Sequence, residues 1–487
     1  TTKSGKNGAL NVSYNGFVGS KSSTYRPDML NSGEYAELYN EGLINRGVAP
    51  LYSAEQIGWF KDGSKPDLYP NTNWTDLVLD KSAITTLHSL NFSGGTDKIR
   101  YFTGLSYLYD DQFMPGQDNK RYNLQTKVSS DVTSWLTLNT NVSYIRNEND
   151  RTNGSTSNYQ MQAVPPTMVA RQSNGEWGTI NGGVIASQNF INFNALRNLN
   201  KNDWSHGNSA NTVIDLGFDL KPFKGLVING QGSYTGNEGK SKTYRGLQDN
   251  ALNYFTGAGI PGTGSSINQM SLSWSNTSRL LYTGIAKYDW TDQKHAFTVL
   301  GGASYEQNKY EGLSASRNNF PTDDLEDLSS GSSAGVDLTN GGGIYEFNLA
   351  SYFGRVNYSY LGRYLLEANI RTDGSSRFFK DSRWGVFPSF SAGWLVSEES
   401  FMKNVEWVNL LKFRGSYGVL GNINNVGNYD YFQTYNNNLG YNFENQVVSG
   451  ISESKPSNTR LGWEKVAITD FGVDLEVLDN KLSITAD

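Results

Sequence analysis

Two short glycine-rich segments have the spacing of catalytic motifs. Gly257 to Gly262, GAGIPG, fits the G-x-G-x-x-G pattern of dinucleotide-binding loops, and Gly331 to Gly335, GSSAG, fits the G-x-S-x-G pattern of a nucleophilic serine. Such chemistry requires a strand before the motif and a helix after it, and neither segment has that context. We therefore expect both segments to be flexible loops, and we predict no catalytic residue.

Metal sites have few candidate ligands in this sequence. The chain has no cysteine and three histidines, His88, His206 and His295. The histidines are far apart and lack a second ligand two to four residues away, so we do not expect a zinc site. The acidic stretch PTDDLEDLSS brings Asp323, Asp324 and Asp327 together, and carboxylates are ligands that Ca²⁺ prefers. A solvated acidic loop explains the same residues, so no metal or cofactor is predicted.

The segment RYLLEANIRTDGSSRF, from Arg363 to Phe378, has charged residues at regular spacing. One set of alternate residues is apolar: Tyr364, Leu366, Ala368 and Ile370. The other set is polar: Glu367, Asn369, Arg371 and Asp373. In an extended chain the two sets point to opposite faces. The apolar face belongs either on a protein core or against lipid with a wet lumen behind it, and the segment alone does not decide.

The composition is compatible with a membrane β-barrel. The 487 residues include 52 glycines, 29 tyrosines, 23 phenylalanines and 11 tryptophans, and the mean hydropathy is -0.54. No run approaches the roughly 18 apolar residues of a transmembrane helix. A barrel strand needs apolar residues only at alternate positions, so low hydropathy does not exclude it. The net charge of -6 and the pI near 5.3 argue against nucleic acid as a partner.

Alternating runs rich in aromatic and β-branched residues predict about fifteen strands. They span residues 9–19, 87–94, 98–109, 121–132, 135–146, 211–221, 225–234, 271–290, 294–311, 343–361, 363–373, 384–397, 409–421, 463–477 and 481–487. Several exceed ten residues, whereas soluble strands usually have about five or six. Long tilted strands of this kind are typical of membrane barrels.

Short and long connections alternate between these runs. The short ones include GTD, TS, PFK, TDQ and Gly362, whereas residues 20–86, 147–210, 235–270, 312–342 and 422–462 form long connections. In an up-and-down sheet this order places every long loop at one end, as in outer-membrane barrels. Aromatic residues near the tight turns, among them Tyr360, Tyr364 and Trp290, fit a membrane interface, although core packing at strand ends explains them too.

Two helices are expected among the connections. In MLNSGEYAELYNEGLINRG, Asn31 and Glu34 have the spacing of a capping box, and apolar residues follow at helical spacing. The second predicted helix is the short segment SEESFMK, which begins at Ser397 and interrupts an otherwise short turn.

Several stretches resemble the SusC/RagA family of TonB-dependent outer-membrane transporters of Bacteroidetes. The opening TTKSGK is similar to the end of the family's plug domain, and DMLNSGEYAELYNE is similar to its first-loop helix. LLEANIRTDGSSRF, RWGVFPSFSAGWLVSEESFMK, LLKFRGSYGVLGN and LGWEKVAITDFGVDLEVLDNKLSITAD resemble successive barrel blocks in family order. Residues 147–269 match the family poorly.

The resemblance implies a barrel of about 22 strands closed by a plug. It implies residues 1–7 as the plug–barrel junction and residues 8–487 as an incomplete transmembrane barrel with long extracellular loops. The plug, the TonB box and roughly the last seven strands are then expected outside these residues. Because an odd strand number leaves an unpaired edge that lipid does not tolerate, we expect further strands to complete the barrel.

The function implied by the resemblance is TonB-dependent import of oligosaccharides or peptides across the outer membrane of a Gram-negative bacterium, with no enzymatic activity. The implied partners are a SusD-like surface lipoprotein, the TonB complex, outer-membrane lipid and a second transporter–lipoprotein pair. A soluble or surface-attached all-β protein that binds or degrades glycans is the alternative, and a passive porin is a further one. The sorted loops and long strands favour the transporter.

Two groups of residues are candidates for contact with substrate or plug. In the lumen they are Glu367, Arg371, Asp373 and Arg377, which alternatively form a network that keeps buried charges paired. In the loops they are Trp59, Trp74, Tyr159 and Trp177, which are suited to stacking on sugar rings or contacting peptide side chains, unless they only pack the loops.

Overall fold

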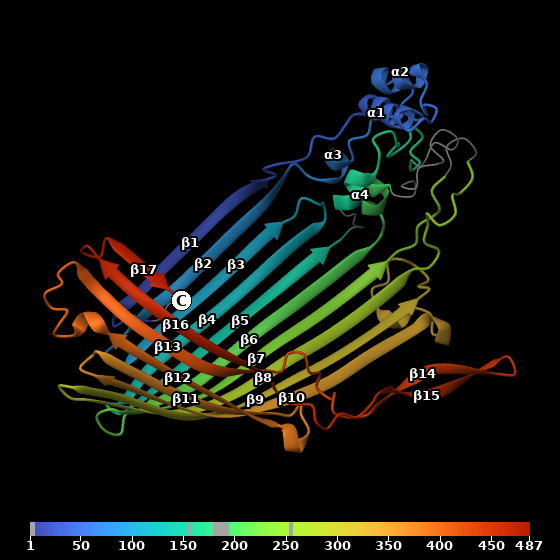
Figure 1. Ribbon diagram of the computed structural model, residues 1–487. Coiled ribbons are helices and arrows are strands. Elements are labelled where there is room, and N and C mark those ends of the chain that lie inside the picture. The colour runs from blue at the N-terminus through green and yellow to red at the C-terminus, as the bar shows by residue number, and fades with distance from the viewer. Residues whose placement is uncertain (1–4, 153, 155–157, 179–193, 253–256) are drawn as a thin grey trace.

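One antiparallel sheet of 15 strands dominates the structure. The computed structural model describes residues 5–152, 154, 158–178, 194–252 and 257–487. Each strand pairs with its neighbours in the order β1 to β13, then β16 and β17, while β14 and β15 form a separate hairpin. The sheet curves around on itself, with β1 and β17 as its two edges (Figure 1). The prediction of a large antiparallel up-and-down sheet is confirmed.

The strands are β1 (Gly8–Ser22), β2 (Ser82–Gly95), β3 (Ile99–Asp111), β4 (Gln117–Thr133), β5 (Leu136–Arg151), β6 (Trp204–Leu220), β7 (Leu226–Arg245), β8 (Gln269–Thr291), β9 (His295–Asn318), β10 (Leu338–Tyr360), β11 (Tyr364–Ser375), β12 (Trp384–Leu395), β13 (Val408–Asn422), β14 (Thr434–Phe443), β15 (Gln446–Lys455), β16 (Glu464–Val477) and β17 (Leu482–Ala486). The helices are α1 (Ser32–Asn45), α2 (Ala54–Asp62), α3 (Trp74–Val78), α4 (Asn158–Ala163) and α5 (Ala195–Leu199). Short 3-10 turns are η1 (Leu328–Ser330), η2 (Gly335–Asp337), η3 (Lys380–Ser382) and η4 (Val396–Glu398).

The connections are sorted by length, as predicted. Tight turns join β2 to β3, β4 to β5, β6 to β7, β8 to β9 and β10 to β11, whereas helices α1 to α4 gather at the opposite end (Figure 1). Two links at the long-loop end depart from the rule, because only residues 112–116 separate β3 from β4 and only residues 376–383 separate β11 from β12. The link from β12 to β13 at the other end, residues 396–407, is longer than either. No helix in the described part of the chain is long and apolar enough to cross a membrane.

The first predicted helix is confirmed and the second is wrong. Helix α1 begins after Asn31, whose side chain accepts from the Glu34 N–H at 3.0 Å while Glu34 accepts from the Asn31 N–H at 3.1 Å. The segment from Ser397 instead forms the 3-10 turn η4 and further turns. There the Glu399 carboxylate accepts hydrogen bonds from Tyr364 at 2.6 Å and Trp394 at 3.1 Å. These bonds tie the segment to the sheet in a turn conformation.

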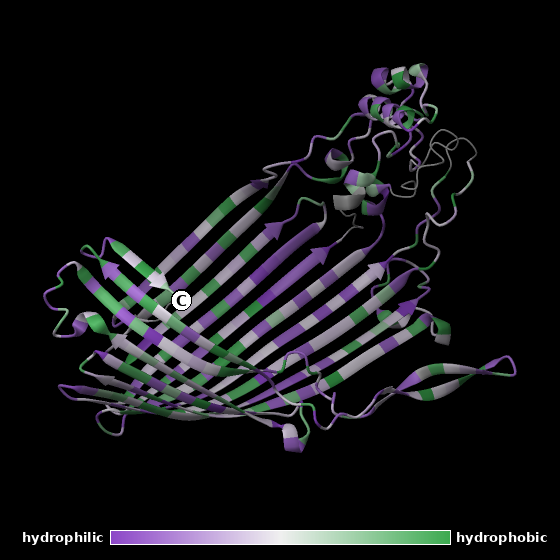
Figure 2. Ribbon diagram, viewed as in Figure 1, coloured by the Kyte–Doolittle hydropathy of each residue, from purple (hydrophilic) through white to green (hydrophobic). Residues whose placement is uncertain are grey.

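The register of the strands separates a polar face from an apolar face. Residues that pair directly across strands share a face. One row across seven strands is polar throughout: Asp289, Thr298, Asn357, Glu367, Ser391, Ser416 and Asp470. The next row, on the other face, is largely apolar: Trp290, Phe297, Tyr358, Leu366, Ala392, Gly415 and Phe471. Figure 2 shows the same alternation as bands along the strands.

The apolar row lies on the convex face, which the described residues leave uncovered. Leu366 is 53% exposed and Ile370 is 56% exposed there. Buried apolar clusters occur instead in the loops, one around Trp74 and Met168 and another around Tyr52 and Phe60. A sheet of this size with an uncovered apolar face fits a lipid-facing wall.

We expect substitutions at Leu366 and Glu367 in the full-length protein to show which face meets lipid. Lysine at Leu366 should impair assembly, because a lysine at the bilayer midplane costs about 2–4 kcal/mol on a lipid-facing strand. Leu366→Phe should assemble normally, since lipid has no fixed shape to violate, and Glu367→Lys should have a small effect in a wet lumen. Heat-modifiable mobility of outer-membrane fractions measures assembly. If Leu366→Phe assembles poorly while Leu366→Lys does no worse, Leu366 packs against protein.

Candidate functional site

Three of the four predicted lumen residues lie together on the concave face of β11. Glu367, Arg371 and Asp373 occupy alternate positions of the strand and pair with Asn357, Phe353 and Ser351 of β10. Their side chains therefore point to the same side of the sheet as the polar row. The prediction that they share a face is consistent with this register, whereas the proposed contact with substrate or plug stays a prediction.

Arg371 is the centre of this small network. Its Nε donates to both carboxylate oxygens of Asp373 at 2.8 Å, its Nη2 donates to Ser351 Oγ at 2.9 Å, and its guanidinium lies 5.6 Å from the centre of the Phe353 ring. Half of the Arg371 side chain remains exposed. The guanidinium is thus held in place while part of its surface faces the open concave side.

Arg377 lies beyond the end of β11 and has different contacts. Its Nε donates to Asn428 Oδ1 at 2.9 Å, its Nη1 donates to the Ile423 carbonyl at 3.3 Å, and its guanidinium lies 4.1 Å from the centre of the Phe347 ring. Its hydrogen bonds go to the long connection after β13 and its ring contact goes to β10, so Arg377 shares no partner with Arg371.

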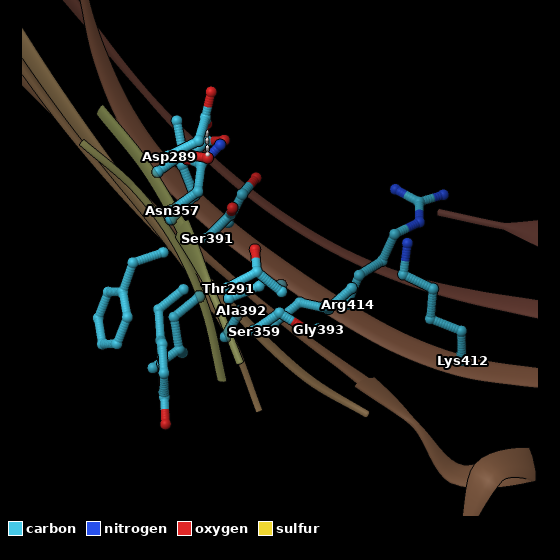
Figure 3. A pocket seen from close by; sticks show the side chains of 18 of the residues that line it. Asp289, Thr291, Asn357, Ser359, Ser391, Ala392, Gly393, Lys412 and Arg414 are labelled. Atoms are coloured by element: carbon cyan, nitrogen blue, oxygen red, sulfur yellow. Dashed lines mark hydrogen bonds between the residues drawn. The ribbon is translucent and has the colours of Figure 1, made fainter. Parts of the chain in front are cut away.

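A pocket of about 590 Å³ lies toward the tight-turn end of β8 to β13 and β16. Figure 3 shows Asp289, Asn357, Lys412 and Arg414 on one side of these strands, the side toward which the sheet curves. Arg414 makes ion pairs with Asp474 at 3.2 Å and with Asp470 at 3.6 Å. The pocket thus combines Glu367 from the predicted set with charged groups that sequence reasoning missed.

A second concave pocket, of about 730 Å³, lies across β3 to β8. Its lining is rich in amides and carboxylates that bond to one another between strands: the Asn139 amide donates to Asp219 at 2.9 Å and the Asn141 amide donates to Asp215 at 2.8 Å. In the sequence these residues stand at every second position of the alternating runs, on the polar side. That alternation was the signal that could have identified them. Such a face offers many hydrogen bonds to a polar ligand or a polar protein surface.

The four loop aromatics have different environments. Trp74 is 3% exposed and its indole N–H donates to the Pro165 carbonyl at 3.1 Å, so it packs the loops and presents no free ring face. Trp59 is half-buried, with Lys65 Nζ 3.3 Å from the centre of its ring. Trp177 is half-buried, with the Arg171 guanidinium 4.7 Å from its ring. Tyr159 belongs to α4, but its side chain lies outside the described residues.

The acidic loop residues are used within the protein. Asp323 accepts from Tyr244 at 2.6 Å and from Asn268 at 3.0 Å; burial by itself raises the pKa of Asp323, yet these hydrogen bonds hold it below its usual value. Asp327 caps η1 through the Ser329 N–H at 2.7 Å. No group of three or more histidine or acidic residues suited to a metal occurs among the described residues.

Both glycine-rich motifs lie in loops, as predicted. The described residues of the segment at 257–262 belong to the connection between β7 and β8, and the segment at 331–335 connects η1 to η2. The three histidines lie on β2, β6 and β9, where His88 bonds to Tyr14 at 2.7 Å and His295 to Tyr358 at 2.9 Å.

Comparison with known proteins finds similar TonB-dependent receptors. No family model matches the chain. The TonB-dependent receptor SusC of Bacteroides thetaiotaomicron is 27% identical over 507 aligned positions, which cover 99% of this chain and 47% of the receptor. The TonB-dependent receptor P26 of Formosa agariphila is 26% identical over 468 positions, which cover 94% of this chain and 43% of that receptor. The chain therefore spans about half the length of the curated relatives it matches.

Among solved structures, the RagAB peptide transporter matches with a TM-score of 0.76 at 20% identity, over 99% of this chain and 54% of the matched chain. That agreement confirms the predicted barrel fold. The curated relatives are receptors rather than enzymes, and they come from Bacteroides and Formosa. In sequence the chain is thus similar to TonB-dependent receptors that include SusC, and in fold it is similar to the barrel of the RagAB peptide transporter.

Proposed function

We propose that this chain forms most of the barrel wall of a TonB-dependent importer for oligomeric nutrients, either oligosaccharides or peptides. The observation that carries the proposal is the pair of faces on one sheet: an uncovered apolar convex face and a concave face lined by polar rows. A wall of this kind separates lipid from a hydrated passage. The SusC and P26 relatives, both named as TonB-dependent receptors, support energised uptake over passive diffusion.

The proposal includes a plug that fills the barrel, with residues 1–7 as its junction to β1. Gly5 lines the larger concave pocket together with Arg100 and Asn139. An ideal Cβ at Gly5 would lie 2.4 Å from the Tyr101 backbone nitrogen, so a side chain there would collide with β3. The chain therefore approaches β1 along the concave face, as a segment coming from a plug should.

A SusD-like lipoprotein is the proposed partner at the long-loop end, where it would capture the oligomer before entry. The loops there present small folded units with their own buried clusters rather than extended chain. Pairs of transporter and lipoprotein are further proposed to associate as dimers. These partners rest on the family, since they belong to the whole protein.

We expect uptake by the full-length protein to require TonB. Deleting TonB in the native host should abolish uptake of the oligomer but leave binding at the cell surface, because capture precedes the energised step. Deleting the lipoprotein gene should weaken capture. Uptake of labelled oligosaccharide and peptide pools, measured separately, identifies the substrate class. Uptake that persists without TonB would instead indicate a porin.

Arg371 is proposed to contact the plug or the passing substrate. We expect Arg371→Gln to reduce uptake while leaving assembly and surface binding intact, because a half-exposed cationic side chain is lost from the concave face. Lys309→Gln is the matched control: Lys309 pairs with Glu311 two residues away at 3.4 Å, as Arg371 pairs with Asp373, but on the convex face. Initial uptake rates in cells with equal surface levels measure the effect. Equal uptake by both variants would assign Arg371 a structural role only.

A further inference from the structure

The connection from β13 to β16 contains a hairpin that stands clear of the sheet. Strands β14 and β15 pair only with each other and extend beyond the long-loop end (Figure 1). The hairpin exposes apolar side chains, among them Tyr441, Phe443 and Val447. A two-stranded hairpin on its own is marginally stable in water, so its position depends on its attachment to the rest of the molecule.

The first attachment is the segment of residues 423–433, here called the mouth loop, which leads from β13 into the hairpin. It contacts Arg377 through the Ile423 carbonyl and the Asn428 side chain. Arg377 in turn stacks on Phe347, which lies on the concave face because it shares the parity of Ser351 and Asn357 on β10. The mouth loop is therefore bound to the concave face of the sheet at the long-loop end, beside the Arg371 network.

A second contact fixes the same loop to β10. The Glu346 backbone N–H donates to the Tyr429 hydroxyl at 3.3 Å. Phe379, in the turn that follows β11, packs on Tyr431 with ring centres 6.1 Å apart. The mouth loop thus packs against both the turn between β11 and β12 and the outer part of β10.

The mouth loop is also tied to the base of the hairpin. Asp430 makes an ion pair with Lys455, the last residue of β15, at 2.8 Å, and Ser457 Oγ donates to the Tyr431 carbonyl at 3.1 Å. The Lys455 ammonium and the Gly427 N–H both lower the pKa of Asp430, so this carboxylate is ionised at neutral pH. The base of the hairpin and the mouth loop are therefore joined by an ion pair and a hydrogen bond.

Residues 456–463, which lead from β15 to β16, contact the same turn between β11 and β12. Trp463 donates from its indole N–H to the Arg383 carbonyl at 2.9 Å and packs on Phe378, which is fully buried. Ser382 Oγ donates to the Thr459 carbonyl at 3.3 Å. This side is held by ring packing and backbone acceptors. On the entry side Arg377 donates both of the charged hydrogen bonds to the loop, beside the Tyr429 and Tyr431 contacts.

We propose that Arg377 is a positioning residue that clamps the mouth loop to the concave face of β10. The mouth loop and the hairpin of β14 and β15 then move as one unit. Its two donors reach the loop while its flat face stays on Phe347, a combination that lysine does not provide. Releasing the clamp frees the mouth loop and the hairpin together. The position of the exposed hairpin then sets how far the mouth loop extends over the concave face at the long-loop end.

The absence of cysteine in this chain suits a spin-label test in the full-length protein in nanodiscs. One label pair joins Thr339→Cys on the wall to Asn425→Cys in the mouth loop, and a second joins Thr339→Cys to Ser449→Cys in the hairpin. If the remainder of the full-length protein contains cysteines, they are first replaced by serine. Pulsed EPR then gives both distance distributions without any transport assay.

With Arg377 intact, each pair should give one narrow distance peak. With Arg377→Leu both peaks should become broad distributions, and Arg377→Lys should restore them only in part. Lys380→Leu, in the same turn, is the matched control, since Lys380 is exposed and contacts Phe379 rather than the loop. If Arg377→Leu does not assemble, Asn428→Leu is used in its place. It removes the hydrogen bond between Arg377 Nε and Asn428 Oδ1 from the loop side and should also broaden both peaks.

Two results would overturn the proposal. Unchanged distributions in Arg377→Leu, or in Asn428→Leu where that variant replaces it, would show that other contacts hold the loop. Broadening of the loop peak with an unchanged hairpin peak would show that the two do not move together. Because the readout is a distance, neither result depends on whether the protein imports an oligomer.

Discussion

The structure depends on one constraint: a single continuous sheet must present opposite chemistry on its two faces. Alternate residues of each strand point to opposite faces, and the register aligns a polar row across β8 to β13 and β16 on one face and a largely apolar row beside it on the other. A slip of one residue at any strand would bring charged groups to the apolar face. The tight turns at one end fix the register, which leaves the other end free for long loops.

The same constraint explains how much of the fold could be predicted from sequence. Strand β11 was predictable because its apolar and polar residues alternate and a tight turn precedes it. The outer end of β7 was underestimated most: the predicted run ends at residue 234 and the strand continues to Arg245, because residues 235–243 have no apolar side chain to mark one face. The hairpin β14 to β15 was missed because its run is interrupted by Asn436 and its neighbours, and the pairing shifts register there.

The candidate site was predictable only in part. Glu367, Arg371 and Asp373 were identified because they lie in one strand with clear alternation. Arg414, whose carboxylate partners Asp470 and Asp474 come from another strand, required the pairing of β13 with β16. Trp74 shows the opposite limit: an aromatic residue in a long loop looks available for a ligand until the fold of the loop buries it. Burial within loops depends on contacts between distant segments, and no local pattern reports these.

The central claim is that the convex face of the sheet meets lipid and the concave face meets water. The most direct test places single spin labels at residues 364–373 of the full-length protein in a bilayer and compares relaxation by oxygen, which partitions into lipid, with relaxation by a water-soluble nickel chelate. We predict a period of two, with oxygen contact highest at Leu366, Ala368 and Ile370 and nickel contact highest at Glu367, Asn369 and Arg371. Equal oxygen contact at both sets, or the reverse phase, would contradict the account.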